Sequence, residues 1–265
     1  MKIGMFDSGV GGLTLLHEAL QIMPNEAYFY YADSDHVPYG LRAKEEVAEY
    51  SDEAVEFLLE QGCDAIVIAC NTATSVAANL LRKKYTVPII GVEPAVKPAV
   101  EMNSDGRILV IATPITVREK KFRDLLDRVD DQHKVDMLAL PELVSFAERG
   151  EFDSERVTSY ISAELDNYIS EHSENDVELD DYDILVFGCT HFNHFEKALR
   201  PFFKKEMIMI DGAEGTIKNL HRIMEERGAE SEGRGYVRYF VSGREVTGTE
   251  TAVFYEKLLR HLDEQ

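Results

Sequence analysis

Short runs of isoleucine and valine alternate with longer amphipathic stretches along this chain, and this alternation is the feature that most constrains its fold. Strands buried inside a parallel sheet are almost entirely apolar, whereas the helices that cover them carry a single apolar stripe. The pattern therefore predicts an α/β fold built from doubly wound sheets. We expect strands over nine ranges: 3–7, 27–32, 64–70, 87–91, 107–112, 134–139, 183–188, 207–211 and 235–241.

The segment 43–61 is an example of the helices expected between these strands. Its apolar residues recur at the spacing of one helical face: Val47, Tyr50, Ala54, Phe57 and Leu58. Gly62 follows at the position where glycine commonly ends a helix. Residues 43–61 are therefore predicted to form one amphipathic helix.

Two segments of the chain repeat the same pattern around a cysteine. Ile66–Thr72 and Leu185–His191 each consist of a buried strand, a small residue, a cysteine and then polar residues that begin a helix. The repeat predicts two similar halves, and ligands of open α/β sheets bind at the carboxyl ends of the strands. We therefore expect one cleft between the two halves, with Cys70 and Cys189 inside it.

The composition excludes several classes of partner and location. The 265 residues include 28 basic and 49 acidic side chains, a formal charge of −21, so nucleic acid and anionic membranes should be repelled. No segment reaches the roughly 18 apolar residues of a membrane span, and the N-terminus lacks a signal-peptide pattern. The three cysteines cannot all pair with one another, which favours free thiols. We expect a soluble cytoplasmic protein whose acidic segment 172–181 forms a solvated loop.

Cys70 and Cys189 are the main candidates for catalysis. A buried cysteine usually packs as a small apolar residue, and this interpretation fits Cys63, which lacks the repeated context. A helix N-terminus, by contrast, stabilises the thiolate and lowers the cysteine pKa from about 8.5. If the two thiols face each other across a substrate, one removes a proton from Cα while the other delivers a proton to the opposite face. Such a pair inverts a stereocentre and requires no cofactor.

The glycine-rich turn Asp7–Gly12 admits more than one role. It is either simply a sharp turn, or its N–H groups bind a carboxylate or phosphate. It lacks the lysine of a nucleotide-binding loop and the glycine spacing of a dinucleotide site. Asp7 itself either accepts a hydrogen bond from a substrate ammonium group, tunes Cys70, or begins the helix that follows.

His191 stands two residues after Cys189, where an imidazole can exchange a proton with the thiol. With His194 it could instead bind a metal, but a zinc site needs three or four ligands and the sequence offers no second cluster. We therefore expect no metal site. Two other groups have two interpretations each: Pro38, Tyr39 and Gly40 form a turn or a binding loop, and Thr113 and Thr116 are helix caps or donors to a substrate carboxylate.

Taken together, the motifs resemble those of glutamate racemases in the cofactor-independent aspartate/glutamate racemase superfamily. The similarity is carried by Asp7–Thr14, Ala69–Thr74 and Gly188–His191, with support from Tyr31–Asp33, Pro38–Gly40 and Gly91–Pro98. A histidine at position 191 resembles the glutamate branch, because aspartate racemases tend to have glutamate there. The chain departs from the usual family pattern at Phe192-Asn193-His194, at Leu140–Leu143 and at Arg118–Phe122.

The resemblance implies specific roles for these residues. Cys70 would be the base acting on D-glutamate and Cys189 the base acting on L-glutamate, assisted by Asp7 and His191 respectively. Glu148 would support His191. The positions that match substrate-binding residues of the family are Asp7, Ser8, Pro38, Tyr39, Gly40, Asn71, Thr72, Thr113, Thr116, Thr190 and His191.

The family also implies an architecture and a metabolic role. Two pseudosymmetric doubly wound α/β domains, residues 1–96 plus 210–265 and residues 97–209, would enclose the active site in the cleft between them. The enzyme would use no cofactor and would supply D-glutamate for peptidoglycan. Racemisation of aspartate or another amino acid stays open as an alternative, as does a racemase-like binding or regulatory protein. The sequence also leaves open whether the chain forms a homodimer.

Overall fold

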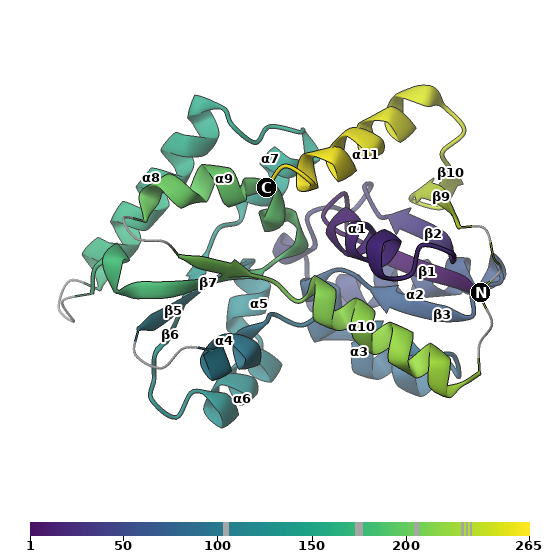
Figure 1. Cartoon of the computed structure of the whole chain (residues 1–265), viewed down its shortest axis with the longest axis horizontal. Coiled ribbons are helices and arrows are strands. Elements are labelled where there is room, and N and C mark those ends of the chain that lie inside the picture. The colour runs from purple at the N-terminus through teal and green to yellow at the C-terminus, as the bar shows by residue number, and fades with distance from the viewer. Residues whose placement is uncertain (103–105, 173–176, 204–206, 229–230, 232, 234) are drawn as a thin grey trace.

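Two mainly parallel sheets lie side by side in this computed structural model, which describes residues 1–102, 106–172, 177–203, 207–228, 231, 233 and 235–265 (Figure 1). The larger sheet has the order β10-β9-β2-β1-β3-β4, and the smaller has the order β6-β5-β7-β8. We call them, with their helices, the first half and the second half. The strands are β1 (Lys2–Asp7), β2 (Ala27–Ala32), β3 (Ala65–Ile68), β4 (Ile89–Gly91), β5 (Arg107–Ala112), β6 (Val135–Ala139), β7 (Tyr182–Gly188), β8 (Ile208–Ile210), β9 (Tyr236–Val241) and β10 (Arg244–Glu245).

The two halves repeat one topology. The order β2-β1-β3-β4 in the first half matches the order β6-β5-β7-β8 in the second, and every one of these strand pairs is parallel. The helix that follows β3 and the helix that follows β7 therefore begin at equivalent places. The predicted α/β class with two similar halves is confirmed.

Helices cover both faces of each sheet, as expected for doubly wound sheets (Figure 1). The α-helices are α1 (Leu13–Ile22), α2 (Lys44–Glu60), α3 (Asn71–Lys84), α4 (Val96–Met102), α5 (Pro114–Arg118), α6 (Lys120–Val129), α7 (Glu142–Glu148), α8 (Glu155–Glu171), α9 (Glu196–Leu199), α10 (Ala213–Glu226) and α11 (Thr249–Leu262). Short 3-10 helices are η1 (Tyr39–Leu41), η3 (Leu179–Asp181), η4 (Thr190–Phe195) and η5 (Arg200–Phe202).

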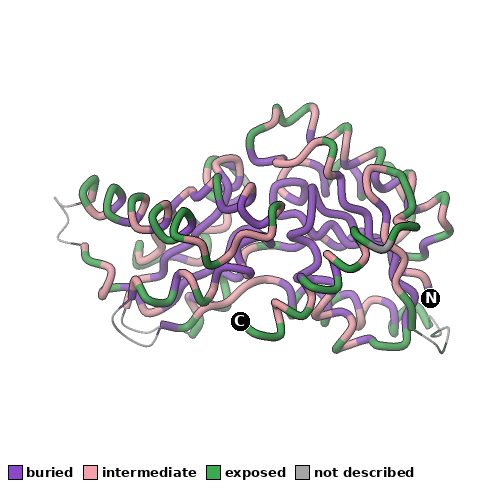
Figure 2. Tube along the Cα trace, turned by 90° about the horizontal axis from the view of Figure 1, so that it is seen from above, coloured by how far each residue is buried: buried purple, intermediate pink, exposed green. Residues whose placement is uncertain are grey.

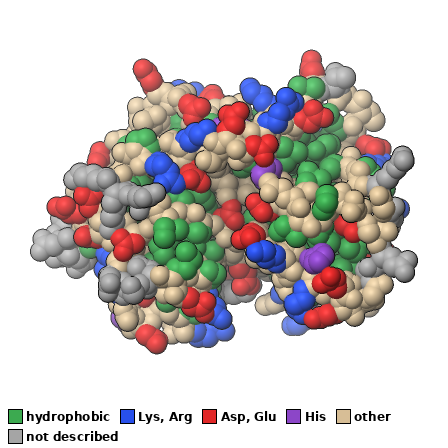
Figure 3. Space-filling view, in the orientation of Figure 1, with side chains coloured by type: hydrophobic (Ala, Val, Ile, Leu, Met, Phe, Trp, Pro, Cys, Tyr) green, Lys and Arg blue, Asp and Glu red, His purple; other side chains and the backbone are tan. Residues whose placement is uncertain are grey.

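The core follows this layering. Apolar side chains of α2 and α3 pack on one face of the first sheet, and those of α4 and α6 pack on one face of the second. A third, larger cluster fills the other face of both sheets and runs without interruption from one half to the other. Figure 2 shows the resulting buried interior, with exposed positions concentrated on the outer helices. Acidic and basic side chains are interspersed on the face seen in Figure 3.

The C-terminal segment connects the two halves. Strand β9 adds to the first sheet beside β2, and α11 then crosses toward the second half (Figure 1). There Nε2 of His261 lies 3.0 Å from the carbonyl oxygen of His194, and the His261 ring stacks on Phe152 with centroids 4.2 Å apart. The segment therefore completes one half while contacting the other.

The strand predictions hold for all nine ranges, with ends that differ by a few residues. The two-residue strand β10 was not predicted, because Arg244 and Glu245 are exposed and carry no apolar pattern. The helix expected over 43–61 is α2, and Gly62 follows it with a φ of +81°. The division of the chain at residues 96/97 and 209/210 stays a prediction.

Two further expectations concern the surface. Of the predicted loop 172–181, residues 173–176 lie outside the described residues, and Leu179–Asp181 form the 3-10 helix η3. Among the described residues, no helix is both long and apolar enough to cross a membrane.

Candidate active site

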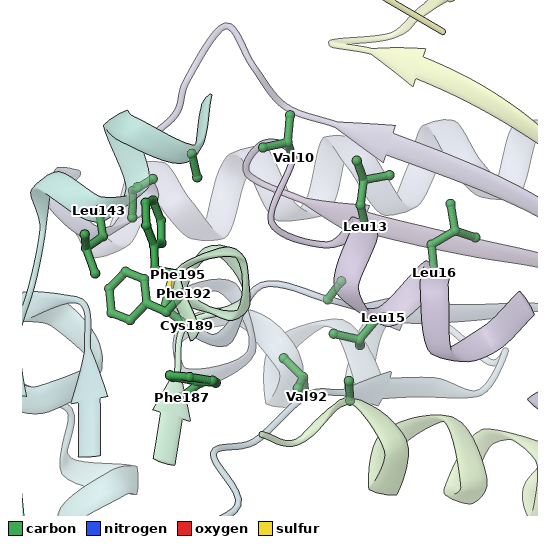
Figure 4. Packing of buried hydrophobic residues seen from close by; sticks show 14 of the residues in the cluster. Val10, Leu13, Leu15, Leu16, Val92, Leu143, Phe187, Cys189, Phe192 and Phe195 are labelled. Carbon is green, nitrogen blue, oxygen red and sulfur yellow. The ribbon is translucent and has the colours of Figure 1, made fainter. Parts of the chain in front are cut away.

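Both cysteines stand where a strand ends and a helix begins. Cys70 follows β3 and caps α3, with its Sγ accepting a hydrogen bond from the N–H of Ala73 at 3.5 Å. Cys189 follows β7 and precedes η4, a 3-10 helix of six residues, without a capping bond from its side chain. The predicted helix starts are therefore present, but the one after Cys189 is short and tightly wound. Figure 4 shows Cys189 next to Phe192 and Phe195 of that turn.

One small pocket, which we call the cysteine pocket, is lined by both cysteines. Its other lining residues are Ser8, Pro38, Tyr39, Gly40, Asn71, Thr72, Thr113, Val144 and His191. The first half and the second half both contribute to this wall. The free space inside it is close to that of a single water molecule, so an amino acid enters only if the walls of the pocket move apart.

On the Cys70 side, the hydrogen bonds lead to a buried carboxylate. The Cys70 thiol and the Ser8 hydroxyl are bonded at 3.9 Å, and that hydroxyl donates to Oδ1 of Asp7 at 3.4 Å. The N–H of Gly9 donates to the same oxygen at 2.9 Å, and the Thr190 hydroxyl donates to Oδ2 at 3.0 Å. Burial raises the pKa of Asp7, although the nearby His191 charge opposes this. Asp7 therefore lies behind the pocket wall and holds Ser8 beside Cys70.

On the Cys189 side, the hydrogen bonds lead to an imidazole and a second carboxylate. Sγ of Cys189 lies 3.8 Å from Nδ1 of His191, and Nε2 of His191 lies 2.7 Å from Oε1 of Glu148. The N–H of Val10 donates to the same Glu148 oxygen at 2.7 Å. Burial lowers the pKa of His191, but its bonds with Cys189 and Glu148 outweigh this and raise it well above the usual value. The geometry allows a proton to pass between Cys189 and His191 and between His191 and Glu148.

The expected lowering of the thiol pKa is wrong for Cys70. Burial, together with the negative charge of Asp7, raises the pKa of Cys70 far above its usual range. The bond from Ala73 acts in the opposite direction and is too weak to compensate. The prediction considered the N-terminus of α3 but not the loss of water around a thiol that is only 6% exposed. Cys63 is also buried, away from the cysteine pocket, and burial raises its pKa to about 12.

The glycine-rich turn makes room for the second half. A Cβ on Gly9 would overlap the Glu148 carboxylate, and a Cβ on Gly11 would overlap the His191 ring. The N–H groups of Gly9, Val10 and Gly11 point to side-chain atoms of Asp7, Glu148 and His191 respectively. These N–H groups are thus occupied by the protein itself, so the structure does not favour a bound carboxylate or phosphate at this turn.

The remaining candidates form the wall of the pocket or lie just behind it. The hydroxyls of Thr72 and Thr113 are bonded at 3.0 Å, and those of Thr113 and Thr116 at 3.1 Å, which joins α3 to α5. The Tyr39 hydroxyl donates to Oδ2 of Asp33 at 2.6 Å. Oδ1 of Asn71 is buried and has no hydrogen-bond partner among the described residues. Asn71 therefore offers an acceptor that a donor group of a ligand can satisfy.

Phe192, Asn193 and His194, which depart from the family pattern, each have packing or hydrogen-bond contacts inside the protein. Phe192 is fully buried, Asn193 donates to Asp211, and the His194 ring stacks with Phe152 at 5.1 Å. Burial is the main cause that lowers the pKa of His194 well below its usual value, and the charges of His261 and His191 lower it further. No cluster of three or more metal-binding side chains occurs in the described part of the chain.

Reasoning from the sequence missed Val144. This residue of α7 brings an apolar side chain to the cysteine pocket from the second half. A valine inside a short amphipathic helix carries no sequence signal that separates pocket lining from core packing. Glu148, at the end of the same helix, was reached only through the family resemblance.

Comparison with known proteins adds to this geometry. A family model described as Asp/Glu/Hydantoin racemase matches residues 8–220. A glutamate racemase of Lachnospira eligens is 45% identical over 269 residues, which cover 99% of this chain and 98% of that protein. A solved glutamate racemase isoform of Bacillus anthracis superposes with a TM-score of 0.80 at 30% identity, covering 99% of this chain and 94% of that one.

A glutamate racemase of Thermus thermophilus, solved in complex with β-chloro-D-alanine, gives a TM-score of 0.74 at 32% identity, covering 98% of this chain and 92% of that one. The matches extend over both halves and over both cysteine motifs. The chain therefore belongs to the Asp/Glu/hydantoin racemase family.

Proposed function

We propose that this chain is a glutamate racemase, which interconverts L- and D-glutamate by moving protons at Cα between Cys70 and Cys189 without a cofactor. The observation that carries the proposal is that both thiols line the same small pocket. Proteins 42–48% identical to this chain over more than nine-tenths of its length are named glutamate racemases. Glutamate is therefore the substrate to test first.

In this mechanism each thiol is the base in one direction and the acid in the other. With D-glutamate, the Cys70 thiolate takes the Cα proton and the C–H electron pair stays on Cα. The Cys189 thiol then donates a proton to the opposite face of Cα, and its own electron pair remains on sulfur. With L-glutamate the two roles are exchanged. Because removal and delivery occur on opposite faces, the configuration at Cα inverts.

The substrate itself activates Cys70 in this account. Burial and the Asp7 charge favour the neutral thiol, since they raise the pKa of Cys70. A positive charge within a few ångströms favours a thiolate, and the ammonium group of glutamate is such a charge. Asp7 keeps the Ser8 hydroxyl beside Cys70, and His191 exchanges a proton with Cys189.

Local groups would hold the anionic substrate despite the acidic surface. Helix α3, of 14 residues, begins at Asn71, so its first N–H groups and the dipole favour a carboxylate. The hydroxyls of Thr72 and Thr113 supply further donors once a ligand competes for them. Pro38, Tyr39, Gly40 and Thr116 shape or support the same wall.

The same proposal includes an architecture and a cellular role. Residues 1–96 plus 210–265 would form one domain and residues 97–209 the other, with the substrate between them. The three free cysteines fit a cytoplasmic location, where D-glutamate would be supplied to peptidoglycan synthesis. The acidic surface argues against nucleic acid as a partner, and a homodimer is left to measurement of the solution mass.

A comparison of two substrates tests the proposed function. The purified protein is incubated separately with L-glutamate, D-glutamate, L-aspartate and D-aspartate, and enantiomers are resolved by chiral chromatography. We expect each glutamate enantiomer to approach an equal mixture, with aspartate at least about tenfold slower. Faster turnover of aspartate would reassign the substrate, and turnover of neither amino acid would reject the proposal.

A further inference from the structure

Glu148 lies between the cysteine pocket and a larger pocket at the surface. This outer pocket is lined among others by Val10, Ser34, Glu148, Arg244, Thr251 and Tyr255. Its far wall is the C-terminal segment, and Phe254 of α11 approaches Gly150, two residues after α7. Glu148 lines the outer pocket but not the cysteine pocket, whereas His191 lines the cysteine pocket but not the outer one. The Glu148–His191 pair therefore spans the wall between them.

Hydrogen-bond distances connect Cys189 through this wall. Sγ of Cys189 is 3.8 Å from Nδ1 of His191, and Nε2 on the opposite side of the ring is 2.7 Å from Oε1 of Glu148. The His191 side chain is 2% exposed and that of Glu148 is 18% exposed. A proton that enters the ring at Nδ1 thus leaves it toward a carboxylate that solvent can reach.

Nε2 of His191 has a partner in either protonation state. When Nε2 carries a proton, it donates to Oε1 of Glu148. When Nε2 has lost its proton, the N–H of Gly11, at 3.3 Å, can donate to it. A buried ring nitrogen that is satisfied in both states avoids the cost of an unpaired polar group during proton transfer.

Cys70 has no comparable route among the described residues. Its thiol is bonded to Ser8 and through it to Asp7, whose side chain is completely buried. The other partners of Asp7 are the N–H of Gly9 and the hydroxyl of Thr190, both of which donate to it. This network ends inside the protein, so the proton of Cys70 reaches solvent only through the cysteine pocket itself.

We propose that Glu148 is the port through which the proton of Cys189 exchanges with solvent, by way of His191 and the outer pocket. This inference rests on the proposed two-cysteine racemisation and extends it. After L-glutamate has been converted, Cys189 is a thiol and Cys70 a thiolate, and the enzyme must restore the opposite pair before another L-glutamate can react. The port removes the proton from Cys189, which is one of the two transfers that restore the starting pair.

The proton balance of the reset is simple. With His191 in its neutral form, protonated at Nε2, the S–H bond of Cys189 breaks as Nδ1 gains a proton, while the N–H bond at Nε2 breaks as Oε1 of Glu148 gains one. The ring is then protonated on Nδ1, and a tautomer exchange through water in the cysteine pocket returns that proton to Nε2 before the next turnover. Glu148 then releases its proton to water in the outer pocket, and Cys70 takes one from water in the cysteine pocket after the product leaves. Conversion of D-glutamate runs the same transfers backwards, and no oxidant or reductant takes part.

Steady-state kinetics of Glu148→Gln separate a port from a purely structural role. The amide oxygen of glutamine can still accept from Nε2 but cannot carry the proton onward. Because the reset follows product release, it limits kcat and not kcat/KM. We expect kcat to fall about tenfold or more in both directions, with kcat/KM within about threefold of wild type.

A small diffusible buffer provides a second readout. Raising imidazole at fixed pH and ionic strength should restore kcat of Glu148→Gln by accepting the proton in the outer pocket. Adding Thr251→Trp, which narrows that pocket, should remove the restoration. Glu142→Gln, an exposed change in the same helix, is the matched control and should behave as wild type.

The outcomes are distinct. A parallel fall of kcat and kcat/KM that imidazole does not relieve would mean that Glu148 only positions His191, and an unchanged kcat would mean that it carries no proton; either result overturns the port. Wild-type turnover of glutamate is measured in the same series. Its absence would reject the proposed function, and the port with it, whatever the variants do.

Discussion

The hydroxyl of Thr190 donates a hydrogen bond to Oδ2 of Asp7 at 3.0 Å. Asp7 ends β1 in the first half, and Thr190 begins η4 in the second, so this bond crosses between the halves. Oδ1 of the same carboxylate accepts from Ser8, the neighbour of Cys70, while Thr190 directly follows Cys189. One buried carboxylate therefore joins the surroundings of both thiols.

Thr190→Val tests the value of this bond. The change removes a donor from a buried carboxylate, which we expect to lower the free energy of unfolding by about 1–3 kcal/mol. Racemisation should also slow, because Asp7 would no longer be fixed between the two cysteine motifs. Urea unfolding and a racemisation assay measure the two effects. Thr190→Ser keeps the hydroxyl and should restore most of both, and equal losses in Ser and Val would contradict the role of the bond.

Gly11→Ala tests whether the glycine-rich turn exists to admit His191. A Cβ at this position would overlap the imidazole ring, so we expect kcat to fall by about a hundredfold or more as His191 is displaced. Gly215→Ala in α10 is the matched control, because no atom beyond its chain neighbours and the backbone of its own helix lies within 4 Å of its Cβ position. That control should keep full activity and gain roughly 0.4–1 kcal/mol of stability. Normal kinetics in Gly11→Ala would show that the approach of His191 is not required.

His194→Phe tests the cost of an imidazole buried without a polar partner. Burial and the charges of His261 and His191 hold the pKa of His194 well below the usual value of about 6.5. Below about pH 6.5, His194 is therefore protonated in the unfolded chain but stays neutral in the folded protein. The wild-type protein consequently loses stability as the pH falls below about 6.5. The phenylalanine variant lacks this loss.

We expect the stability gained by His194→Phe to be larger at pH 5.5 than at pH 8 when unfolding in urea is compared at both values. His221→Phe changes an exposed histidine, with a side chain 46% exposed, and should show no such difference. A gain from His194→Phe that is the same at both pH values, or larger at pH 8, would be inconsistent with a neutral buried ring.

Alanine substitutions of the cysteines test whether Cys70 and Cys189 are both required as acid and base. Cys70→Ala and Cys189→Ala should each abolish racemisation in both directions, because every turnover needs one acid and one base. Cys70→Ser should leave traces, since a hydroxyl is a far weaker acid than a thiol. Cys63→Ala is the control, because Cys63 packs in the core away from the cysteine pocket, and it should stay active. Helical circular dichroism of all four variants shows whether the fold survives.

Much of the fold could be predicted from local patterns. Buried strands such as β5 are apolar throughout, and the repeat around Cys70 and Cys189 reports two sheets with the same strand order. The short strand β10 escaped detection because its two residues are exposed and polar. Local sequence patterns predict helices and strands that bury an apolar face. They do not predict a strand such as β10, which forms only because it pairs with β9.

The candidate site was predictable where residues stand beside a strand end. Cys70, Asn71 and Thr72 follow β3 directly, and all three line the cysteine pocket. Val144 and Glu148 come from α7, whose position depends on packing between the halves, so no local pattern reports them. The raised pKa of Cys70 could not be predicted either, because desolvation depends on how deeply the folded protein buries the thiol and not on its neighbours in sequence.

The most direct test of two thiols acting on opposite faces of Cα is the isotope content of the product. Wild-type protein equilibrated in D₂O is given L-glutamate, and the D-glutamate formed in the first few per cent of conversion is isolated and its mass determined. The account predicts one deuterium at Cα, because the Cys70 that delivers it has exchanged with solvent and never met the hydrogen that Cys189 removed. D-Glutamate that retains the hydrogen of the starting L-glutamate would mean that one group both removes and returns it, which would contradict the account.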